Sequence, residues 1–293
     1  HHFGKHIVNY GDDAAAIPWD EEYLLLAADG MMPSLLINEP YAAGKASVMV
    51  TVNDIYAMGG HPLGMVNVLA SGNDEQRKLI LQGIQKGCEK LRVPMLGGHV
   101  HPDALRDSTA LSVAILGYAK SLIRSHLARP GDDLVLAVDM EGQAGCRSVV
   151  SWDANSGKNS EELIDRLEVL PAIADKGLAS AGKDISNAGI LGTIAIMIEN
   201  SGNGGIINLD KISQPTSVDF EQWIMCFQSY GFVLASKPSY TSEIQRLFKQ
   251  KHITTSVIGS VTQGDKVEVH NGNDSETLFD FRKEPITGIR CKQ

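Results

Sequence analysis

The chain has 293 residues, a formal net charge of -9 at pH 7 and no long basic cluster, which together argue against a nucleic-acid partner. Its length is comfortable for two domains, and no apolar run reaches the roughly 18 residues of a membrane span, so no membrane contact is expected. The four cysteines form no Cys-x-x-Cys pair and the N-terminus lacks a signal-peptide pattern, so we expect a cytoplasmic protein without a zinc ribbon or disulfide scaffold.

The first α/β unit is predicted over residues 10–118, where apolar runs favour strands and apolar residues at helical spacing favour helices. Asn73 is a suitable N-cap for one of these helices. In chain order we expect a strand over 23–28, a helix over 41–58, a strand over 63–69, a helix from 74 to 91, a short strand over 94–99 that enters a glycine turn, and a strand over 111–116.

A boundary is predicted near residues 118–130, which gives an N-terminal domain over 1–119 and a C-terminal domain over 120–293. Residues 139–158 are the best candidate for a mobile loop. In the second unit we expect strands over 131–138, 205–209, 231–235 and 255–261, and helices over 160–181, 188–200, 220–229 and 242–251. Strands and helices therefore alternate in both halves.

Five aspartates lie beside small residues rather than inside mixed-charge surface helices. They are Asp12 and Asp13 after Gly11, Asp29 at the end of a predicted strand, Asp54 near the end of an apolar small-residue helix, and Asp184. Each acid alone is explained as well by capping a turn or helix. Together they favour a magnesium site, because Mg²⁺ combines a few carboxylates with water and substrate phosphates.

The usual nucleotide-binding loops are missing from the sequence. Gly44-Lys45-Ala46-Ser47 lacks the spacing of a Walker loop, and no Gly-x-Gly-x-x-Gly follows a predicted strand. These absences argue against a Walker-type nucleotidase and a dinucleotide-binding fold.

A second polar group is found at His99-Val100-His101-Pro102-Asp103. Alternate residues of an extended segment point to the same side, so His99 and His101 are expected to lie together. No His-Glu-x-x-His or cysteine partner supports zinc. The pattern favours a polar active-site loop that contacts phosphate or metal-bound water over a metal-binding chaperone site.

Several motifs, in this order, resemble one enzyme superfamily. It contains aminoimidazole ribonucleotide (AIR) synthase, thiamine-monophosphate kinase, selenophosphate synthetase and the hydrogenase-maturation carbamoyl dehydratase. The motifs are Gly-Asp-Asp-Ala-Ala at 11–15, Asn-Asp-Ile-Tyr-Ala-Met-Gly-Gly at 53–60, Gly-Gly-His at 97–99 and Asp-Ile-Ser at 184–186. Gly-Gly-His-x-His-Pro-Asp and Gly-Lys-Asp-Ile-Ser-Asn are most similar to the AIR-synthase-related branch known as a methanogenesis marker.

The resemblance implies a PurM-like α+β fold of two α/β domains that binds ATP and Mg²⁺ as a homodimer. The N-terminal mixed sheets would pair into a barrel, and the C-terminal domain would be a half-barrel sheet with helices. By motif, Asp12, Asp29, Asp54 and Asp184 would hold Mg²⁺ and phosphates. The implied catalytic residues are Asp12, Asp54, His99 and Asp184, and the implied nucleotide-binding residues are Asp13, Asp29, Asn53, Gly97, Gly98, His101, Ser186 and Asn187.

The leading hypothesis is a Mg-ATP-dependent enzyme that phosphorylates an oxygen of an unidentified acceptor. The alternatives are a non-catalytic ATP-binding subunit of a maturation complex, and an activity like that of selenophosphate synthetase or thiamine-monophosphate kinase. Asn187 stands where the thiamine branch has a second Asp, which counts against the thiamine kinase. Only ten residues precede Gly11 here, so we expect this chain to lack the glycine-rich catalytic loop of selenophosphate synthetase.

Overall fold

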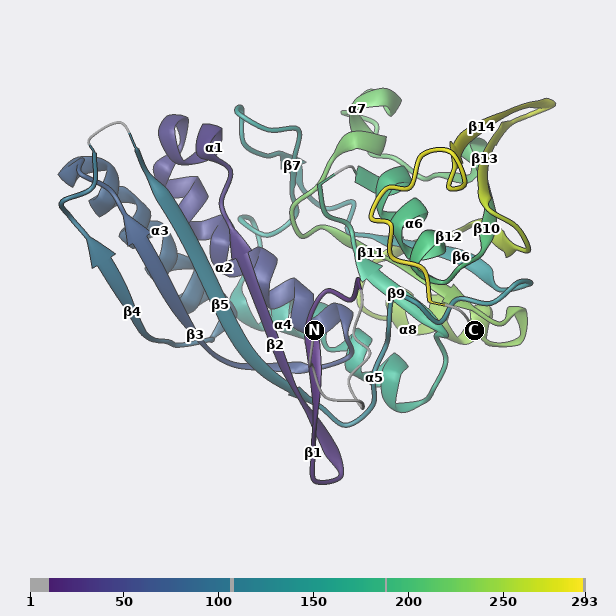
Figure 1. The fold of residues 1–293 in the computed structure, drawn as a ribbon, viewed down its shortest axis with the longest axis horizontal. Helices are drawn as coiled ribbons and strands as arrows, with labels where there is room; N and C mark the ends of the chain where they lie inside the picture. Colours follow the sequence, from purple (N-terminus) through teal and green to yellow (C-terminus); the bar gives the residue numbers. More distant parts are fainter. Residues whose placement is uncertain (1–10, 106–107, 188, 292–293) are drawn as a thin grey trace.

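The computed structural model describes residues 11–105, 108–187 and 189–291, and two β-sheets organise these residues (Figure 1). The first half forms a five-stranded sheet and the second half a seven-stranded sheet, with helices packed against both. Two units of mixed α/β structure are thereby confirmed. Within the described part of the chain, no helix combines the length and apolar character needed to cross a membrane.

The N-terminal sheet has the strand order β1-β2-β5-β3-β4. Its strands are β1 (Ala15–Trp19), β2 (Glu22–Gly30), β3 (His61–Ala70), β4 (Met95–His101) and β5 (Ala110–Ala119). β3 and β4 run parallel, and the other neighbouring strands run antiparallel. β4 is therefore the edge strand on the side away from β1.

Three helices cover one face of this sheet (Figure 1). They are α1 (Pro33–Asn38), α2 (Pro40–Ala57) and α3 (Asp74–Leu91). The Asn73 side chain caps α3 by accepting a 3.1 Å hydrogen bond from the Gln76 amide, as the sequence predicts. Gly44 of α2 and Gly83 of α3 let the two backbones meet, because a Cβ on Gly83 would lie 2.1 Å from the Tyr41 carbonyl oxygen.

The C-terminal sheet has the order β14-β13-β10-β12-β6-β11-β9. Its strands are β6 (Asp133–Val138), β9 (Ala181–Asp184), β10 (Gly204–Asn208), β11 (Gly231–Ser236), β12 (Thr254–Thr262), β13 (Lys266–Asn271) and β14 (Asp274–Asp280). The helices of this half are α4 (Ser160–Leu167), α5 (Val169–Asp175), α6 (Gly189–Asn200), α7 (Phe220–Met225), α8 (Pro238–Lys249) and the 3₁₀ turn η1 (Leu209–Lys211). β7 (Gln143–Ala144) and β8 (Trp152–Asp153) pair separately.

One apolar core joins the two halves. Ile55 of α2 and Leu25 of β2 belong to the same buried cluster as Leu170 of α5, Phe232 of β11 and Phe248 of α8. Because α2 packs against β2 and β5 and also contacts β9 and α5, it is the element that relates one half to the other. A second core, which includes Trp152 and Trp223, lies within the C-terminal half.

Some predicted elements differ from the structure for local reasons. The helix expected over 160–181 is two short helices, because Pro171 near the start of α5 cannot donate the amide bond that a continuous helix needs. β9 follows, although its sequence Ala-Gly-Lys-Asp does not resemble a strand. Gly97 and Gly98 lie inside β4 rather than in a turn. A Cβ on Gly98 would lie 2.5 Å from the Asn67 carbonyl oxygen, so the close β3–β4 pairing requires glycine there.

The segment expected to be a mobile loop, 139–158, is anchored at several points. Trp152 is buried and its indole N–H donates to the Asp139 carbonyl oxygen at 2.9 Å. The Asp139 carboxylate accepts a 2.7 Å hydrogen bond from Arg166 and lies 3.3 Å from the Lys158 ammonium. These bonds hold the segment in place, and the Ser156 hydroxyl accepts a hydrogen bond from the Lys45 ammonium of α2.

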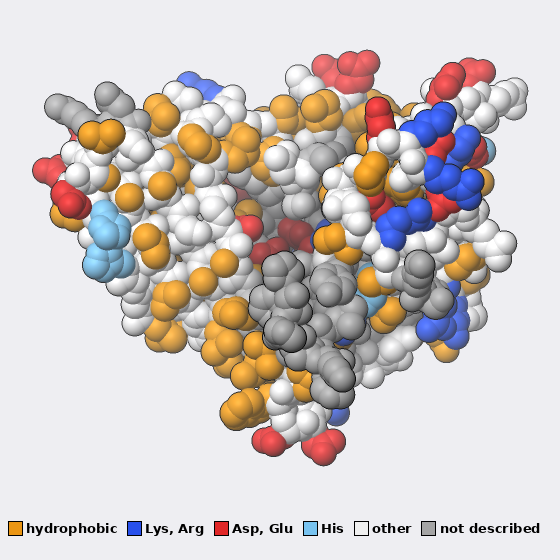
Figure 2. Space-filling view, viewed as in Figure 1, with side chains coloured by type: hydrophobic (Ala, Val, Ile, Leu, Met, Phe, Trp, Pro, Cys, Tyr) orange, Lys and Arg blue, Asp and Glu red, His pale blue; other side chains and the backbone are white. Residues whose placement is uncertain are grey.

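The face of the N-terminal sheet opposite the helices is exposed and apolar. Leu26 of β2 pairs with Leu116 of β5, and both side chains are more than 40% exposed. Val66 and Val68 of β3 are about half exposed on the same face. Figure 2 shows hydrophobic side chains spread over this surface.

Candidate functional site

Four carboxylates from four separate segments of the chain line one cavity of about 370 Å³ between the two halves. Asp13 precedes β1, Asp29 lies at the end of β2, Asp54 is in the last turn of α2, and Asp184 ends β9. Figure 2 shows acidic side chains inside the hollow at the centre of the molecule. Ser186 and Asn187, also predicted as site residues, line the same cavity.

A lysine that the sequence analysis did not single out fixes one of these acids. The buried Lys183 ammonium forms an ion pair with the Asp13 carboxylate, whose other oxygen lies 3.3 Å from the amide nitrogen of Asp184. Burial alone would lower the pKa of Lys183, but the charges of Asp13, Asp184 and Asp54 raise it. In the sequence, only the position of Lys183 marks it as a site residue, because it lies between Gly182 and Asp184 in a short run of otherwise small residues.

The acids of the cavity repel one another. Burial raises the pKa of Asp54 well above its usual value, and the charges of Asp184, Asp13 and Asp29 add to that effect. Burial and the charge of Asp13 raise the pKa of Asp184 to about 8. Burial and Asp13 likewise raise the pKa of Asp29. Ionising all four carboxylates would set four negative charges against the single positive charge of Lys183, so a bound cation would stabilise their ionised forms.

These acids are not a preassembled metal cage. Among the described residues, no three His, Cys, Asp or Glu side chains are grouped closely enough to hold an ion by themselves. Mg²⁺ typically takes only one or two carboxylates and completes its shell with waters and substrate phosphates. The donor set therefore fits Mg²⁺ held jointly with a phosphate ligand better than a metal held by protein alone.

Asp12 does not line this cavity, although its motif predicted a place in the metal site. Its carboxylate accepts hydrogen bonds from the Ser125 amide at 2.6 Å and the Ser125 hydroxyl at 2.9 Å, and from the Arg124 Nε at 3.1 Å. Burial alone would raise the pKa of Asp12, but His126, Ser125 and Arg124 lower it. In this structure Asp12 joins the start of β1 to the segment that follows β5.

Asn53 also lies apart from the acids. It is buried on α2 beside a separate cavity of about 30 Å³, and its Oδ1 has no hydrogen-bond partner. The Ser229 hydroxyl lines the same small cavity and likewise has no partner. This space is polar and roughly large enough for a buried water that could satisfy both atoms.

The predicted residues of β4 lie at the outer edge of the N-terminal sheet. These four residues, Gly97, Gly98, His99 and His101, are exposed, and none of them lines the acidic cavity or the second cavity described below. The rings of His99 and His101 lie together with centroids 4.3 Å apart, as alternation along a strand predicts. Through their pairing with Val68 and Ala70, both histidines share the exposed apolar face of the sheet.

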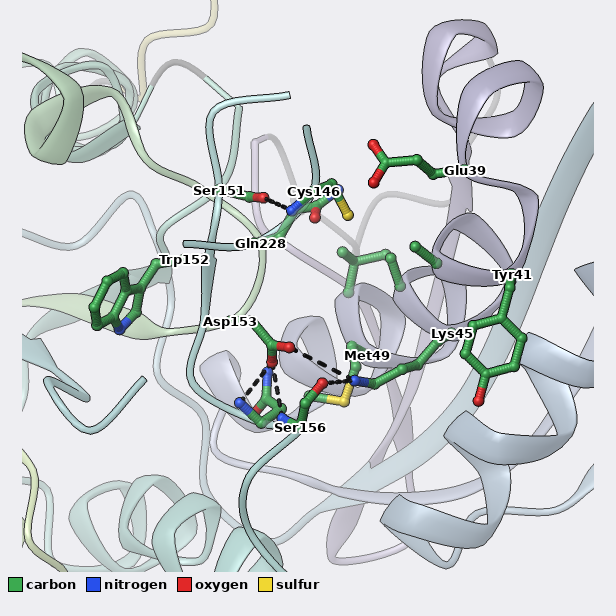
Figure 3. Close-up of a pocket in the computed structure, with 15 residues that line it drawn as sticks. Glu39, Tyr41, Lys45, Met49, Cys146, Ser151, Trp152, Asp153, Ser156 and Gln228 are labelled. Carbon is green, nitrogen blue, oxygen red and sulfur yellow. Dashed lines mark hydrogen bonds and ion pairs between the residues drawn. The ribbon is translucent and has the colours of Figure 1, made fainter. Parts of the chain in front are cut away.

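A second cavity of about 230 Å³ lies next to the acidic one, and Val50 and Gln228 line both (Figure 3). One wall is α2, with Lys45, and the other is the anchored segment 139–158. The Lys45 ammonium points across the cavity to the Ser156 hydroxyl, which accepts its hydrogen bond, and lies 3.9 Å from the Asp153 carboxylate. Cys146 is half-buried in this wall.

The backbone between the two cavities is strained. Gln228 has φ 75° and Ser229 has φ 63°, a left-handed conformation that residues with a side chain rarely adopt. Phe227 and Gln228 line the acidic cavity, and Gln228 also lines its neighbour. Strained backbone concentrates at functional sites, so we expect this loop to belong to the site, although no sequence motif marks it.

The chain belongs to the AIR synthase related protein family. Residues 11–119 match the N-terminal domain of that family and residues 129–271 match its C-terminal domain. Protein sll0787 of Synechocystis sp. is 40% identical over 282 residues, which cover 96% of this chain and 87% of the relative. Protein MJ0640 of Methanocaldococcus jannaschii is 37% identical over 285 residues, with the same coverage of both chains.

Two solved structures have the same fold. T. maritima PurL complexed with ATP matches with a TM-score of 0.77 and 19% identity, over 92% of this chain and 46% of that one. The chain thus spans about half the length of PurL. AaThiL complexed with AMPPCP and TMP matches with a TM-score of 0.70 and 19% identity, over 94% and 93% of the two chains. At such identities the likeness shows the PurM-like fold.

Proposed function

We propose that the protein binds Mg-ATP in the acidic cavity and transfers the γ-phosphoryl group to an oxygen of a small acceptor. The observation that carries this proposal is the convergence of four carboxylates on one cavity in which burial and mutual repulsion raise the pKa of Asp29, Asp54 and Asp184. In such a site the ionised carboxylates are unfavourable without a cation, and a bare polyphosphate would make them more so. A magnesium–nucleotide complex supplies both the cation and the missing oxygen ligands.

The similar structures support a nucleotide. PurL of T. maritima is complexed with ATP and AaThiL with AMPPCP and TMP, and both have the fold of this chain. Their low identity to this chain leaves the acceptor open. The family relationship and the cavity together favour ATP-dependent chemistry over a metal-binding chaperone at His99 and His101.

The expected work of the protein is to position the reactants. Asp29, Asp54 and Asp184 would hold the magnesium, which neutralises phosphate charge when it is bound. Lys183, which lies in β9, holds the Asp13 carboxylate in place through their ion pair. In the transfer, the acceptor oxygen forms a bond to the γ-phosphorus while the bond to the β,γ-bridging oxygen breaks, and ADP leaves with that electron pair. Such reactions need little covalent participation by side chains.

Binding measured with and without metal tests this proposal. ATP should raise the melting temperature in Mg²⁺ and should have little effect in excess chelator, because the acids repel an uncomplexed triphosphate. Mg²⁺ alone serves as the control. Equal stabilisation by ATP in chelator would rule out a shared metal–nucleotide site. Formation of ADP with a candidate acceptor would then separate an enzyme from an ATP-binding subunit.

A further inference from the structure

The cavity beside the acids has a distinctive charge arrangement. Among the described residues that line the two cavities, Lys45 is the only one with a cationic side chain, and it lies in the second cavity. The same cavity contains the carboxylates of Glu39 and Asp153. A ligand there meets one positive group and two negative groups, which disfavours a simple anion.

Each of these three charges is held in a defined place. Glu39 accepts hydrogen bonds from the Ser148 amide at 2.8 Å and the Ser148 hydroxyl at 2.7 Å, both through Oε2. These bonds, a backbone hydrogen bond from Arg147 and the nearby Arg147 charge lower the pKa of Glu39, so its carboxylate is held ionised at the cavity. Asp153 accepts from the Asn155 and Ser156 amides through Oδ1. Its Oδ2 lies 3.9 Å from the Lys45 ammonium, too far for a close hydrogen bond.

The position of the cavity connects it with the proposed reaction. Val50 and Gln228 line both spaces, so a molecule in the second cavity lies beside the phosphate-binding acids. Ala42, Ala46 and Met49 give the α2 wall a small apolar surface. The volume of about 230 Å³ corresponds to roughly eight waters, which is close to the size of an amino acid.

We propose that this second cavity is the acceptor site and that the acceptor is a small zwitterion, an amino acid or a molecule derived from one. The Lys45 ammonium binds its carboxylate, Glu39 binds its ammonium group, and its side-chain oxygen lies toward Val50 and Gln228. The inference rests on the proposed phosphoryl transfer. It assigns the class of acceptor and two residues that recognise it.

Cys146 provides a direct reporter, since its thiol is in the wall of the cavity. Its alkylation by iodoacetamide can be followed by peptide mass spectrometry in the intact protein with Mg²⁺ and AMPPCP. L-Glutamate at about ten times its Kd should slow alkylation roughly tenfold. Glutarate, which lacks the ammonium group, and butylamine, which lacks a carboxylate, should give little protection at the same concentration. L-Aspartate and L-glutamine are tested in the same way, as two further amino acids that carry both groups.

Matched variants identify the residues. Lys45→Met and Glu39→Gln should each abolish protection by the zwitterion. Lys90→Met removes the same charge from a lysine that bonds the Ser156 carbonyl oxygen but lines neither cavity, and it should leave protection unchanged. AMPPCP binding, measured by calorimetry, should persist in all three variants and shows that they fold.

Two failures can be told apart. If AMPPCP binds but none of the three amino acids protects Cys146, or glutarate protects equally well, the zwitterion assignment is wrong. If Lys45→Met loses AMPPCP affinity while remaining folded, Lys45 binds nucleotide phosphate instead, which also overturns it. Absence of AMPPCP binding by the unaltered protein would instead refute the proposed phosphoryl transfer.

Discussion

Two adjacent aspartates have different environments at the entrance to β1. Asp12 accepts bonds from Ser125 and Arg124 and lies outside the cavity, whereas Asp13 lines the cavity and pairs with Lys183. A sequence motif marks both residues equally. Only the three-dimensional placement separates a carboxylate that joins two segments from one that faces a ligand.

We therefore expect opposite effects from two neutral substitutions. Asp54→Asn should weaken Mg-ATP binding by about 10–100-fold with little loss of stability, because it removes a metal ligand and relieves repulsion among acids. Asp12→Asn should cost about 2–3 kcal/mol of folding free energy, because it removes the negative charge that accepts hydrogen bonds from Arg124 and Ser125, while the folded fraction still binds Mg-ATP. Urea unfolding and calorimetry measure the two effects. An unfolded Asp54→Asn whose folded fraction keeps full affinity would make Asp54 a structural cap.

The raised pKa of Asp184 predicts a pH dependence for the ligand-free protein. Burial raises the folded-state pKa from 3.8 to about 8, so the folded state holds the proton more tightly than the unfolded state. This contribution to stability is complete below about pH 4 and is lost as the pH rises through about 8, with a slope of up to about 1.4 kcal/mol per pH unit.

Melting temperatures of the unaltered protein and Asp184→Asn between about pH 5 and 8 test this expectation. The variant should show the shallower decline, and the comparison cancels groups common to both proteins. Saturating Mg-ATP should flatten the curve of the unaltered protein. Parallel curves would mean that Asp184 is ionised in the folded, ligand-free state.

Among the elements, α2 determines the geometry of the site. One part of it contributes Asp54 to the acidic cavity, another contributes Lys45 to the neighbouring cavity, and Gly44 packs on α3. Its position depends on the backbone contact between the two helices. A side chain at that contact should therefore move the whole wall of the site.

Gly83→Ala tests this dependence. Alanine would add about 1 kcal/mol of helix propensity, but its Cβ would lie 2.1 Å from the Tyr41 carbonyl oxygen, a backbone atom that cannot rotate away. The cost of overpacking should exceed the gain in helix propensity, and we expect the free energy of unfolding measured in urea to fall by about 1–3 kcal/mol. Gly157→Ala, where a Cβ has open space, should change stability by less than about 0.5 kcal/mol. Equal stability of both variants would show that α2 and α3 can separate without cost.

The sequence predicted elements best where one local signal dominated. The Asn73 cap and apolar spacing indicated α3, and the apolar run at 23–28 indicated β2. β9 was missed because its lysine and aspartate are buried by partners far away in sequence, which no local pattern reveals.

The candidate site divides in the same way. Asp13, Asp29, Asp54 and Asp184 were recognisable as acids among small residues, and the structure places all four on one cavity. Gln228 was not recognisable from the sequence, because its role depends on a strained loop between two cavities. The second cavity escaped prediction as well, since it forms only where the segment 139–158 packs on α2.

For the whole molecule, the exposed face of the N-terminal sheet predicts an interface with a partner. Leu26, Val66, Val68 and Leu116 place a contiguous apolar surface in solvent, while α2 and α3 cover the opposite face. Apolar patches of this kind usually mark an interface. A second copy with the same face would cover it symmetrically and would bring His99 and His101 into the contact.

Sedimentation at micromolar concentration should accordingly detect a dimer, and Val66→Glu should give a monomer, because a carboxylate on each copy would be buried without a partner. Leu81→Glu is the matched control, since Leu81 is 40% exposed on α3, away from the sheet face, and the variant should remain dimeric. If residues of the partner complete each site, the Val66→Glu monomer should also lose Mg-ATP binding. A folded monomer with normal Mg-ATP affinity would place the nucleotide site within one chain, and His99 and His101 would then serve the interface rather than the reaction.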